Sequence, residues 1–189
     1  MMKIHINRLN QETLKDAVHL KVISWQEELN GKVKDELDEK SVYQEMLHWM
    51  LTEEVDHDKR ILLGAFDHDK VIGAIFLSYA DKVFGESALE LNGLWVDQHY
   101  RGMYLSLRLM KEGFTYYQED HVDKLIVYTH RFAPSRSFYL NLGGQIIKSE
   151  TQLNGQLIID IFSFDLEVLT QKLENKLKRI KTLNQTVLK

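Results

Sequence analysis

The chain has 189 residues, which is enough for one domain, with or without an appendage. It contains no cysteine, so disulfides, thiolate zinc sites and a cysteine nucleophile are excluded. The net charge of −4 argues against a nucleic-acid-binding protein, and no stretch approaches the ~20 continuous apolar residues of a membrane span. The N-terminus lacks an apolar core of signal-peptide length, so we expect a cytoplasmic protein with no membrane partner.

Two helices open the predicted fold. Asn10 can cap a helix that runs to about Glu28, because apolar residues recur there at steps of three and four. Asn30, followed by glycine, should end this helix. After the acidic run DELDE, Ser41 and Gln44 have the spacing of a capping box, which predicts the start of a second helix.

The apolar pattern then changes to short runs that are typical of strands. ILLGAF and VIGAIFLSY, separated by the turn-rich DHDK, predict an antiparallel hairpin. ALELNGLWV predicts a third strand, in which the isolated Gly93 indicates a bulge or a close approach by another group. A helix to about Asp120 should follow, and this crossover makes the next strand, KLIVYTH, parallel to the third.

The remaining segments predict a short helix, a hairpin and a long helix. Pro134 precedes a short helix that Ser135 would cap, and QIIKSET and LIIDIFSF form a hairpin across QLNG. From Asp165, apolar residues up to Leu183 and Val187 follow a heptad pattern that is broken at a d position by a lysine. This helix could pack on its own domain or form a coiled coil. We divide the chain into a domain of residues 1–164 and a C-terminal helical extension of residues 165–189.

The stretch HYRGMYLSL, between the third strand and its helix, has the chemistry of an anion site. A helix N-terminus leaves backbone N–H groups unpaired and adds partial positive charge, so a diphosphate could bind against Gly102 to Ser106. Arg101 could add charge-assisted hydrogen bonds. The other reading is an ordinary strand–helix turn, because a single Arg-Gly pair is a weak motif.

The order of the elements resembles the GNAT superfamily of N-acetyltransferases from about residue 61 to residue 164. ELNGLWVDQHYRGMYLSLRLM is similar to that family's acetyl-CoA segment, in which a strand ending in L-x-V leads to Q/R-x-x-G-x-G/A and a helix. SRSFYLNLGG is similar to the family's short helix with its FYxxxGF ending. The resemblance implies an α/β fold whose mixed, mostly antiparallel twisted sheet has a central, splayed parallel strand pair and flanking helices, here with a C-terminal helix added.

The resemblance also implies where acetyl-CoA would bind. Its pantetheine arm would lie between the third strand and KLIVYTH, with Gly93 as the bulge that separates the two strands. Two departures from the family pattern, His99 and Tyr104, bear on affinity, and Tyr104 should weaken CoA binding by narrowing the approach to the diphosphate. The family's asparagine before the short helix is missing near Phe132, so one pantetheine contact is unassigned. The candidate cofactor-binding residues are Leu94, Trp95, Val96, Arg101, Gly102, Met103, Tyr104, Leu105 and Ser106.

Chemistry at a thioester needs a proton acceptor for the amine, donors for the oxyanion and a proton for the departing thiolate. The resemblance implies that Tyr139 is the general acid and that Glu90 is the base, directly or through water. A backbone N–H near Leu94 would serve the oxyanion. The simpler alternatives are a core tyrosine and a solvated strand glutamate. His130 is expected at the surface or in a loop, close to the acetyl site.

We therefore predict an N-acetyltransferase that moves an acetyl group from acetyl-CoA to a primary amine by direct attack on the thioester, with no metal. The acceptor would be a small-molecule or peptide amine, and the acidic DELDE favours a cationic one, although loop solvation explains these charges equally well. The alternative is a GNAT-like domain that binds CoA poorly and acts as an interaction module through its C-terminal helix. A homodimer is one form that such a module could take. Tyr104 and the basic residues 165–189 motivate this alternative.

Overall fold

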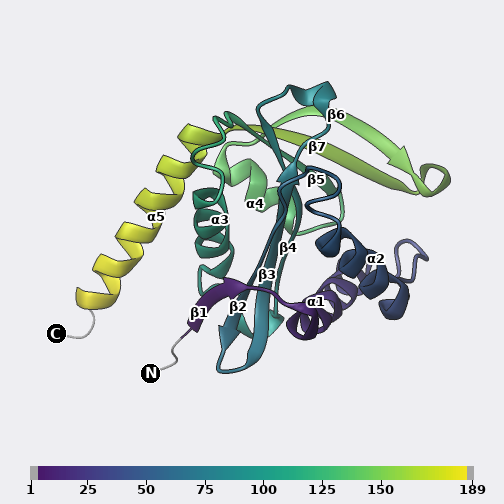
Figure 1. The fold of residues 1–189 in the computed structure, drawn as a ribbon, viewed down its shortest axis with the longest axis horizontal. Coiled ribbons are helices and arrows are strands. Elements are labelled where there is room, and N and C mark those ends of the chain that lie inside the picture. The colour runs from purple at the N-terminus through teal and green to yellow at the C-terminus, as the bar shows by residue number, and fades with distance from the viewer. Residues whose placement is uncertain (1–3, 187–189) are drawn as a thin grey trace.

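The computed structural model describes residues 4–186, and Figure 1 shows them arranged around one twisted sheet. The strands of this range are β1 (Ile4–Arg8), β2 (Ile61–Asp67), β3 (Lys70–Tyr79), β4 (Ala88–Val96), β5 (Lys124–His130), β6 (Gln145–Gln152) and β7 (Leu157–Asp165). Its α-helices are α1 (Gln11–Leu29), α2 (Glu39–Leu51), α3 (Leu105–Thr115), α4 (Ser135–Leu142) and α5 (Leu166–Thr186).

The sheet has the strand order β1-β2-β3-β4-β5-β7-β6. The pair β4–β5 is parallel, and the other neighbouring strands are antiparallel. The helix α3 lies between β4 and β5 in the chain, so the predicted crossover and its parallel strand pair are confirmed. The two predicted hairpins are confirmed as β2–β3 and β6–β7.

The two central strands separate halfway along β4. β4 pairs with β5 from Ala88 to Leu91, whereas its pairing with β3 continues to Val96. Phe76 of β3 lies opposite Gly93 but the next residue lies opposite Leu91, so β4 carries one extra residue at this point. The bulge predicted at Gly93 is therefore confirmed, and it coincides with the end of the β4–β5 pairing.

Helices cover both faces of the sheet. α1 and α2 lie on one face, and α3 and α5 lie on the other (Figure 1). One buried cluster lies between the sheet and α3, α4 and α5, and a second lies between the sheet and α1 and α2. The two faces therefore have separate cores, and the separation of β4 from β5 lies between them.

The C-terminal helix α5 packs on its own domain. Leu166, Leu169 and Leu173 are buried in the same cluster as the apolar side chains of α3. These leucines favour the packed arrangement over the coiled coil, and the boundary between residues 164 and 165 stays a prediction. The heptad positions Leu183 and Val187 lie outside the residues whose side chains the structure describes.

Both predicted ends of α1 agree with the structure. The Asn10 side chain accepts hydrogen bonds from the backbone N–H groups of Glu12 and Thr13 at 3.0 and 2.9 Å, and Asn30 ends the helix in the left-handed conformation. The expected end of α3 at about Asp120 is too late, since the helix ends at Thr115 and continues as turns.

The predicted caps of two helices are wrong. α2 begins at Glu39 with Asp38 as its cap, and Ser41 donates both its backbone N–H and its hydroxyl to the Asp38 carboxylate. A charged carboxylate accepts stronger hydrogen bonds than a serine hydroxyl, so Asp38 caps the helix in place of Ser41. In α4 the cap position is Pro134, and the hydroxyl of Ser135 pairs with Thr129 at 2.8 Å.

Candidate active site

A hollow of about 290 Å³ lies where β4 separates from β5. We call it the central hollow. Its walls come from the end of β4, the second half of α1 and the start of α4. The residues that line it are Ser24, Glu27, Glu28, Leu94, Trp95, Val96, Arg101, Ser106, Pro134, Ser135, Phe138 and Tyr139.

A second hollow of about 350 Å³ adjoins the first at the start of α3, and we call it the loop hollow. It shares Val96, Arg101, Ser106 and Phe138 with the central hollow. The structure thus brings together eight of the nine predicted cofactor-binding residues along the two hollows. Met103, the ninth, lines neither of them and is 41% exposed.

The loop before α3 presents unpaired backbone donors. Gly102 has a φ of 81°, and a Cβ at this position would meet no atom within 4 Å, so open space lies in front of the loop. Among the described residues, none accepts a hydrogen bond from the N–H groups of Gly102 or of residues 104–107. These donors, together with the helix dipole, give the loop hollow the chemistry of an anion site.

Tyr104 occupies the cap position of α3 in the left-handed conformation, with a φ of 60°. A residue with a Cβ pays roughly 1–2 kcal/mol for this conformation, and glycine does not. The sequence alone indicates only that the size of the Tyr104 side chain narrows the approach to the diphosphate. The structure adds a backbone reason for a small residue here, while the 48% exposed side chain lies at the edge of the loop hollow.

Arg101 is already engaged at the mouth of both hollows. Its Nη2 donates to Glu27 Oε2 at 2.7 Å, and its Nε donates to the Val96 carbonyl at 3.2 Å. The guanidinium is therefore held beside the loop. An anion that takes this guanidinium has to compete with the Glu27 carboxylate or share the guanidinium with it.

Tyr139 projects from α4 into the sheet. Its side chain is 4% exposed, and its ring contacts the rings of Phe138, Phe162 and Phe164. The residue also lines the central hollow, and no described residue makes a hydrogen bond to its hydroxyl. Burial, together with the negative charge of Glu28, raises the pKa of Tyr139 well above its ordinary value, so the phenol stays protonated at neutral pH.

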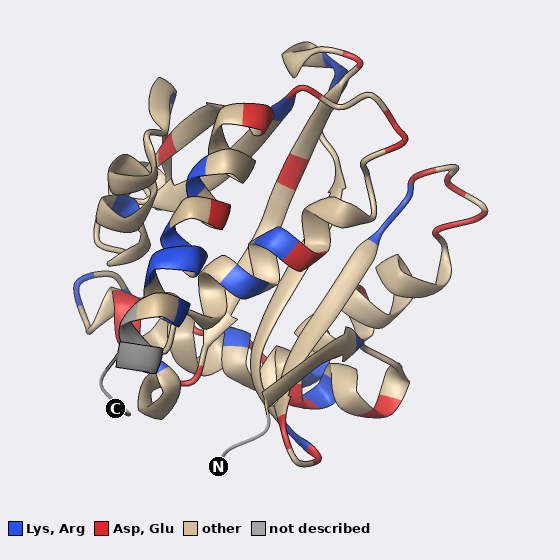
Figure 2. Ribbon diagram, turned by 90° about the vertical axis from the view of Figure 1, so that its left-hand side faces the viewer, with Lys and Arg blue, Asp and Glu red and all other residues tan. Residues whose placement is uncertain are grey.

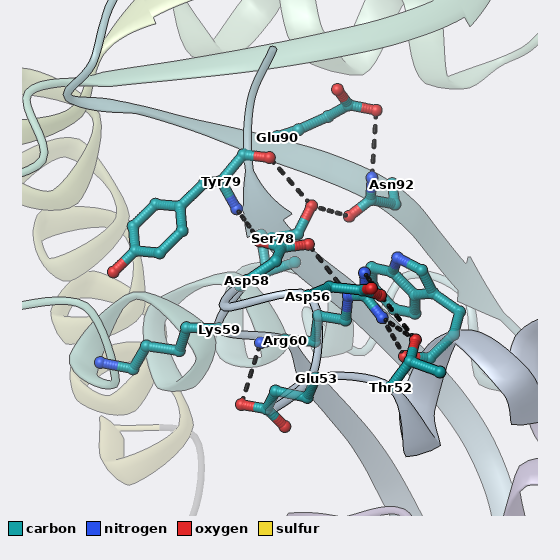
Figure 3. A network of polar contacts seen from close by, with 12 residues as sticks. Thr52, Glu53, Asp56, Asp58, Lys59, Arg60, Ser78, Tyr79, Glu90 and Asn92 are labelled. Atoms are coloured by element: carbon teal, nitrogen blue, oxygen red, sulfur yellow. Dashed lines mark hydrogen bonds and ion pairs between the residues drawn. The ribbon is translucent and has the colours of Figure 1, made fainter. Parts of the chain in front are cut away.

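Glu90 lies away from Tyr139. It stands on β4 opposite Ser78 of β3, and it does not line the central hollow. The Asn92 amide donates to its carboxylate at 3.0 Å, and the Ser78 hydroxyl donates to Asn92 at 3.1 Å (Figure 3). Burial raises the pKa of Glu90, and the hydrogen bond from Asn92 only partly opposes this.

A buried arginine anchors the neighbouring end of α2. Arg60 donates to the carboxylates of Asp56 and Asp58 at 2.8 and 2.9 Å and to the Thr52 hydroxyl at 2.8 Å (Figure 3). These aspartates are therefore ion-paired with a buried arginine. Across residues 4–186 the structure forms no cluster of three or more His, Cys, Asp or Glu side chains that could hold a metal ion.

Two residues that line the hollows, Glu28 and Lys176, had no predicted role, and His130 was expected close to the acetyl site but not buried. Glu28 lines the central hollow and accepts a hydrogen bond from His130, which is 3% exposed, so the expectation of a surface or loop position for His130 is wrong. Lys176 of α5 lines the loop hollow beside Tyr104. Its only signal in the sequence was the lysine at an apolar heptad position.

The comparisons with known proteins agree with this architecture. The sequence model of the acetyltransferase (GNAT) family matches residues 20–143, whereas the search of curated proteins finds no match. Among solved structures, the PaiA N-acetyltransferase from Thermoplasma acidophilum, in complex with coenzyme A, is 22% identical with a TM-score of 0.67, over 87% of this chain and 99% of that chain.

Two further solved structures share the fold. A GNAT-family acetyltransferase from Staphylococcus aureus Mu50 is 20% identical with a TM-score of 0.66, over 87% of this chain and 99% of that one. A ribosomal-protein-alanine N-acetyltransferase from Brucella melitensis is 18% identical with a TM-score of 0.62, over 85% and 99%. The predicted fold is thus confirmed. Within the described part of the chain, no helix is long and apolar enough to cross a membrane.

Proposed function

The chain belongs to the acetyltransferase (GNAT) family, and from this premise we propose that it moves an acetyl group from acetyl-CoA to a primary amine. One observation carries the proposal. The unpaired N–H groups before α3 line a hollow that opens directly onto the separated strands β4 and β5. The likeness to the PaiA N-acetyltransferase, which was solved with coenzyme A, supports the choice of cosubstrate.

The residues of the two hollows fit acetyl-CoA. The N–H groups of Gly102 and residues 104–107, with Arg101 beside them, would hold the diphosphate. Leu94, Trp95 and Val96 would line the pantetheine arm on the β4 side of the central hollow. When bound there, acetyl-CoA supplies the acetyl group as a thioester.

We assign the acid role to Tyr139. Its phenol lines the central hollow and is protonated at neutral pH, and it would give a proton to the sulfur as the C–S bond breaks. A backbone N–H near Leu94 would stabilise the oxyanion.

Two protons leave the nitrogen of a protonated amine during the transfer, and we assign one of them to Glu90. Burial raises the pKa of this carboxyl, which suits a proton acceptor that works near neutral pH. Glu90 does not line the central hollow, so the proton would reach it through water. Asn92 holds the carboxylate in a fixed orientation during this step.

Acetyl-CoA binding and transfer are tested separately. Isothermal titration calorimetry with acetyl-CoA should show saturable binding, and no heat or thermal stabilisation at millimolar concentration would contradict the proposal. Release of free thiol from acetyl-CoA, screened against a panel of polyamines, amino sugars and peptide amines, then identifies the acceptor. A control without amine measures hydrolysis of the thioester.

A further inference from the structure

His130 and Glu28 form a hydrogen-bonded pair that the reaction outlined above does not use. The distance between His130 Nε2 and Glu28 Oε2 is 3.0 Å, although the residues lie 102 positions apart in the chain. His130 ends β5, where this strand no longer pairs with β4, and Glu28 lies in the last turn of α1. The pair therefore bridges the helix layer and the sheet at the point where the sheet opens.

The His130 ring is held tightly in one orientation. It is 3% exposed, and the ring of Trp25 packs edge-on against it with 5.2 Å between the ring centroids. Among the described residues no partner exists for its buried Nδ1. A neutral ring carries one N–H, and this proton fits Nε2, which faces the carboxylate, because a proton on Nδ1 would be a buried donor without an acceptor. His130 Nε2 thus donates to Glu28 Oε2.

Glu28 and Tyr139 line the same hollow. Both residues line the central hollow together with Leu94, and the charge of Glu28 contributes to the raised pKa of Tyr139. Glu90, in contrast, makes its hydrogen bond to Asn92 outside this hollow. Glu27 also lines the hollow but is paired with Arg101, so Glu28 is the carboxylate there that no described Lys or Arg pairs with.

The basic groups around the pair are engaged elsewhere, so none neutralises Glu28. Arg101 is paired with Glu27, and no Lys or Arg of the described residues lies within 4.0 Å of the Glu28 carboxylate. The other charged or titratable groups from the packed elements are Lys32 over the Phe132 ring, Asp35 bonded to Trp25, Arg131 and Arg136 paired with Asp160, and the Tyr139 phenol. The hollow therefore offers one negative charge without a cation beside it.

We propose that Glu28, oriented by His130, binds the acceptor as a cationic amine in the central hollow and takes its first proton. This proposal rests on the proposed function and names the substrate class, namely amines that are protonated at neutral pH. Glu28 is the catalytic residue because it touches the amine, and His130 is a positioning residue.

The ammonium gives one proton to the Glu28 carboxylate, which exposes the nitrogen lone pair. The nitrogen then forms the C–N bond, loses its second proton through water to Glu90, and the C–S bond breaks as Tyr139 gives a proton to the sulfur. Glu28 and Glu90 together hold two protons at this stage. One of these protons restores Tyr139 and the other leaves to solvent, so one proton is released for each acetyl group transferred.

The test compares two acceptors of nearly equal shape. Ethylamine is mostly protonated at neutral pH, whereas methoxyamine is mostly uncharged and has no first proton to lose. Thiol release from acetyl-CoA gives kcat/KM for each acceptor. We expect Glu28→Gln to lower kcat/KM for ethylamine about 100-fold but to change it for methoxyamine by no more than about threefold. Acetyl-CoA affinity should stay unchanged in the variant.

Matched variants separate this role from a structural one. Glu90→Gln should slow both acceptors by a similar factor, since the second proton leaves after attack in either case. His130→Phe removes the hydrogen bond but fills the space beside Trp25, so it should reproduce the selective loss for ethylamine. His130→Gln keeps an N–H donor and should stay closer to the wild type. Glu12→Gln, at the far end of α1, controls for a general effect of charge.

The outcomes are distinguishable. Equal losses for the two acceptors in Glu28→Gln, or no loss at all, would overturn the role of Glu28 while leaving the proposed function intact. A wild-type protein that binds acetyl-CoA but transfers to neither acceptor, nor to any amine of the panel above, would overturn the proposed function, and the role of Glu28 with it.

Discussion

Arg136 of α4 donates from Nε to Asp160 Oδ2 of β7 at 2.8 Å, and the Asp160 side chain is completely buried. Asp160 also accepts hydrogen bonds from Ser149 at 2.6 Å and from Arg131 at 3.2 Å. Arg136 precedes Tyr139 by three residues on the same helix, so the two side chains project from neighbouring turns. The ion pair with Asp160 therefore fixes α4, and with it the phenol, against the sheet.

Asp160→Asn should destabilise the protein by about 3 kcal/mol, because it leaves two arginines facing a neutral group in a buried site. Turnover should fall as well, since α4 loses its anchor. Chemical denaturation measures the free energy of unfolding. Ser149→Ala is the matched control, and it should cost only about 1 kcal/mol because it removes one hydrogen bond. Equal stabilities of Asp160→Asn and wild type would contradict this account.

Asp160 should also make stability depend on acid pH. Burial raises the pKa of this carboxyl, but the hydrogen bonds from Ser149, Arg136 and Arg131 outweigh it and lower the pKa below its ordinary value. The folded state thus binds this proton more weakly than the unfolded state, and the contribution is complete above the unfolded pKa of about 4. Below this pH the wild type should lose stability more steeply than Asp160→Asn, measured by denaturation over a pH series.

Tyr139→Phe should lower kcat about 100-fold, because it removes the proposed proton donor for the sulfur and keeps the aromatic ring. Acetyl-CoA affinity should stay the same, which calorimetry checks. The pKa of Tyr139 is raised by burial and by Glu28, so the phenol stays protonated as the pH rises to about 10. If kcat of the wild type falls with rising pH before the pH reaches about 10, deprotonation of Tyr139 is therefore not the cause. Unaltered turnover in Tyr139→Phe would remove this residue from the acid role.

Tyr104→Gly should bind CoA more tightly than the wild type. The variant widens the approach to the unpaired N–H groups and suits the φ of 60° at this position. Its free energy of unfolding should stay within about 1 kcal/mol of the wild type, since glycine loses in chain entropy what it gains in strain. Tyr104→Val should instead lower it by about 1–2 kcal/mol. Weaker CoA binding in Tyr104→Gly would show that the tyrosine ring contributes contacts to the cosubstrate.

Lys176→Met should weaken CoA binding about fivefold, or by about 1 kcal/mol, because the lysine faces the loop hollow and no described carboxylate pairs with it. Lys178→Met is the control, since Lys178 is 75% exposed and lies beside Glu174 on the same basic helix (Figure 2). Dephospho-CoA separates the two sources of negative charge. A loss that disappears with this ligand places Lys176 at the 3′-phosphate, and a loss that persists places it at the diphosphate. Equal affinities of Lys176→Met and wild type would contradict any contact.

Periodicity and turn chemistry predicted the central part of the fold, because each helix and strand there has a recognisable pattern within its own stretch of sequence. The compact apolar runs of β2 and β3 and the glycine in β4 are signals within a few residues, and α1 has its cap at Asn10. β1 was missed because its residues, Ile4–Arg8, alternate too briefly to exceed the background and gain stability only by pairing with β2.

The site was predictable only in part, for a related reason. The loop before α3 is a local motif, so its residues could be found in the sequence. The pairing of Glu28 with His130 exists only because the fold brings α1 to the end of β5, and neither side chain carries a local signal. Lys176 lies between these two cases. A lysine at an apolar heptad position indicates a role other than packing, but the position alone does not show that the residue lines the loop hollow.

Four residue pairs, Ala88–Leu91 with Lys124–Val127, are the only rungs between the N-terminal and C-terminal halves of the described sheet. Beyond these pairs, β4 and β5 separate, and the backbone of one strand lies on each side of the opening. A ligand bound between the separated parts of β4 and β5 therefore contacts both halves of the chain and links them. Apart from the paired residues, these halves meet mainly through their helices. Ligand binding between the two strands raises the free energy of unfolding with the logarithm of the ligand concentration. The stability of this protein therefore depends on how much ligand is present.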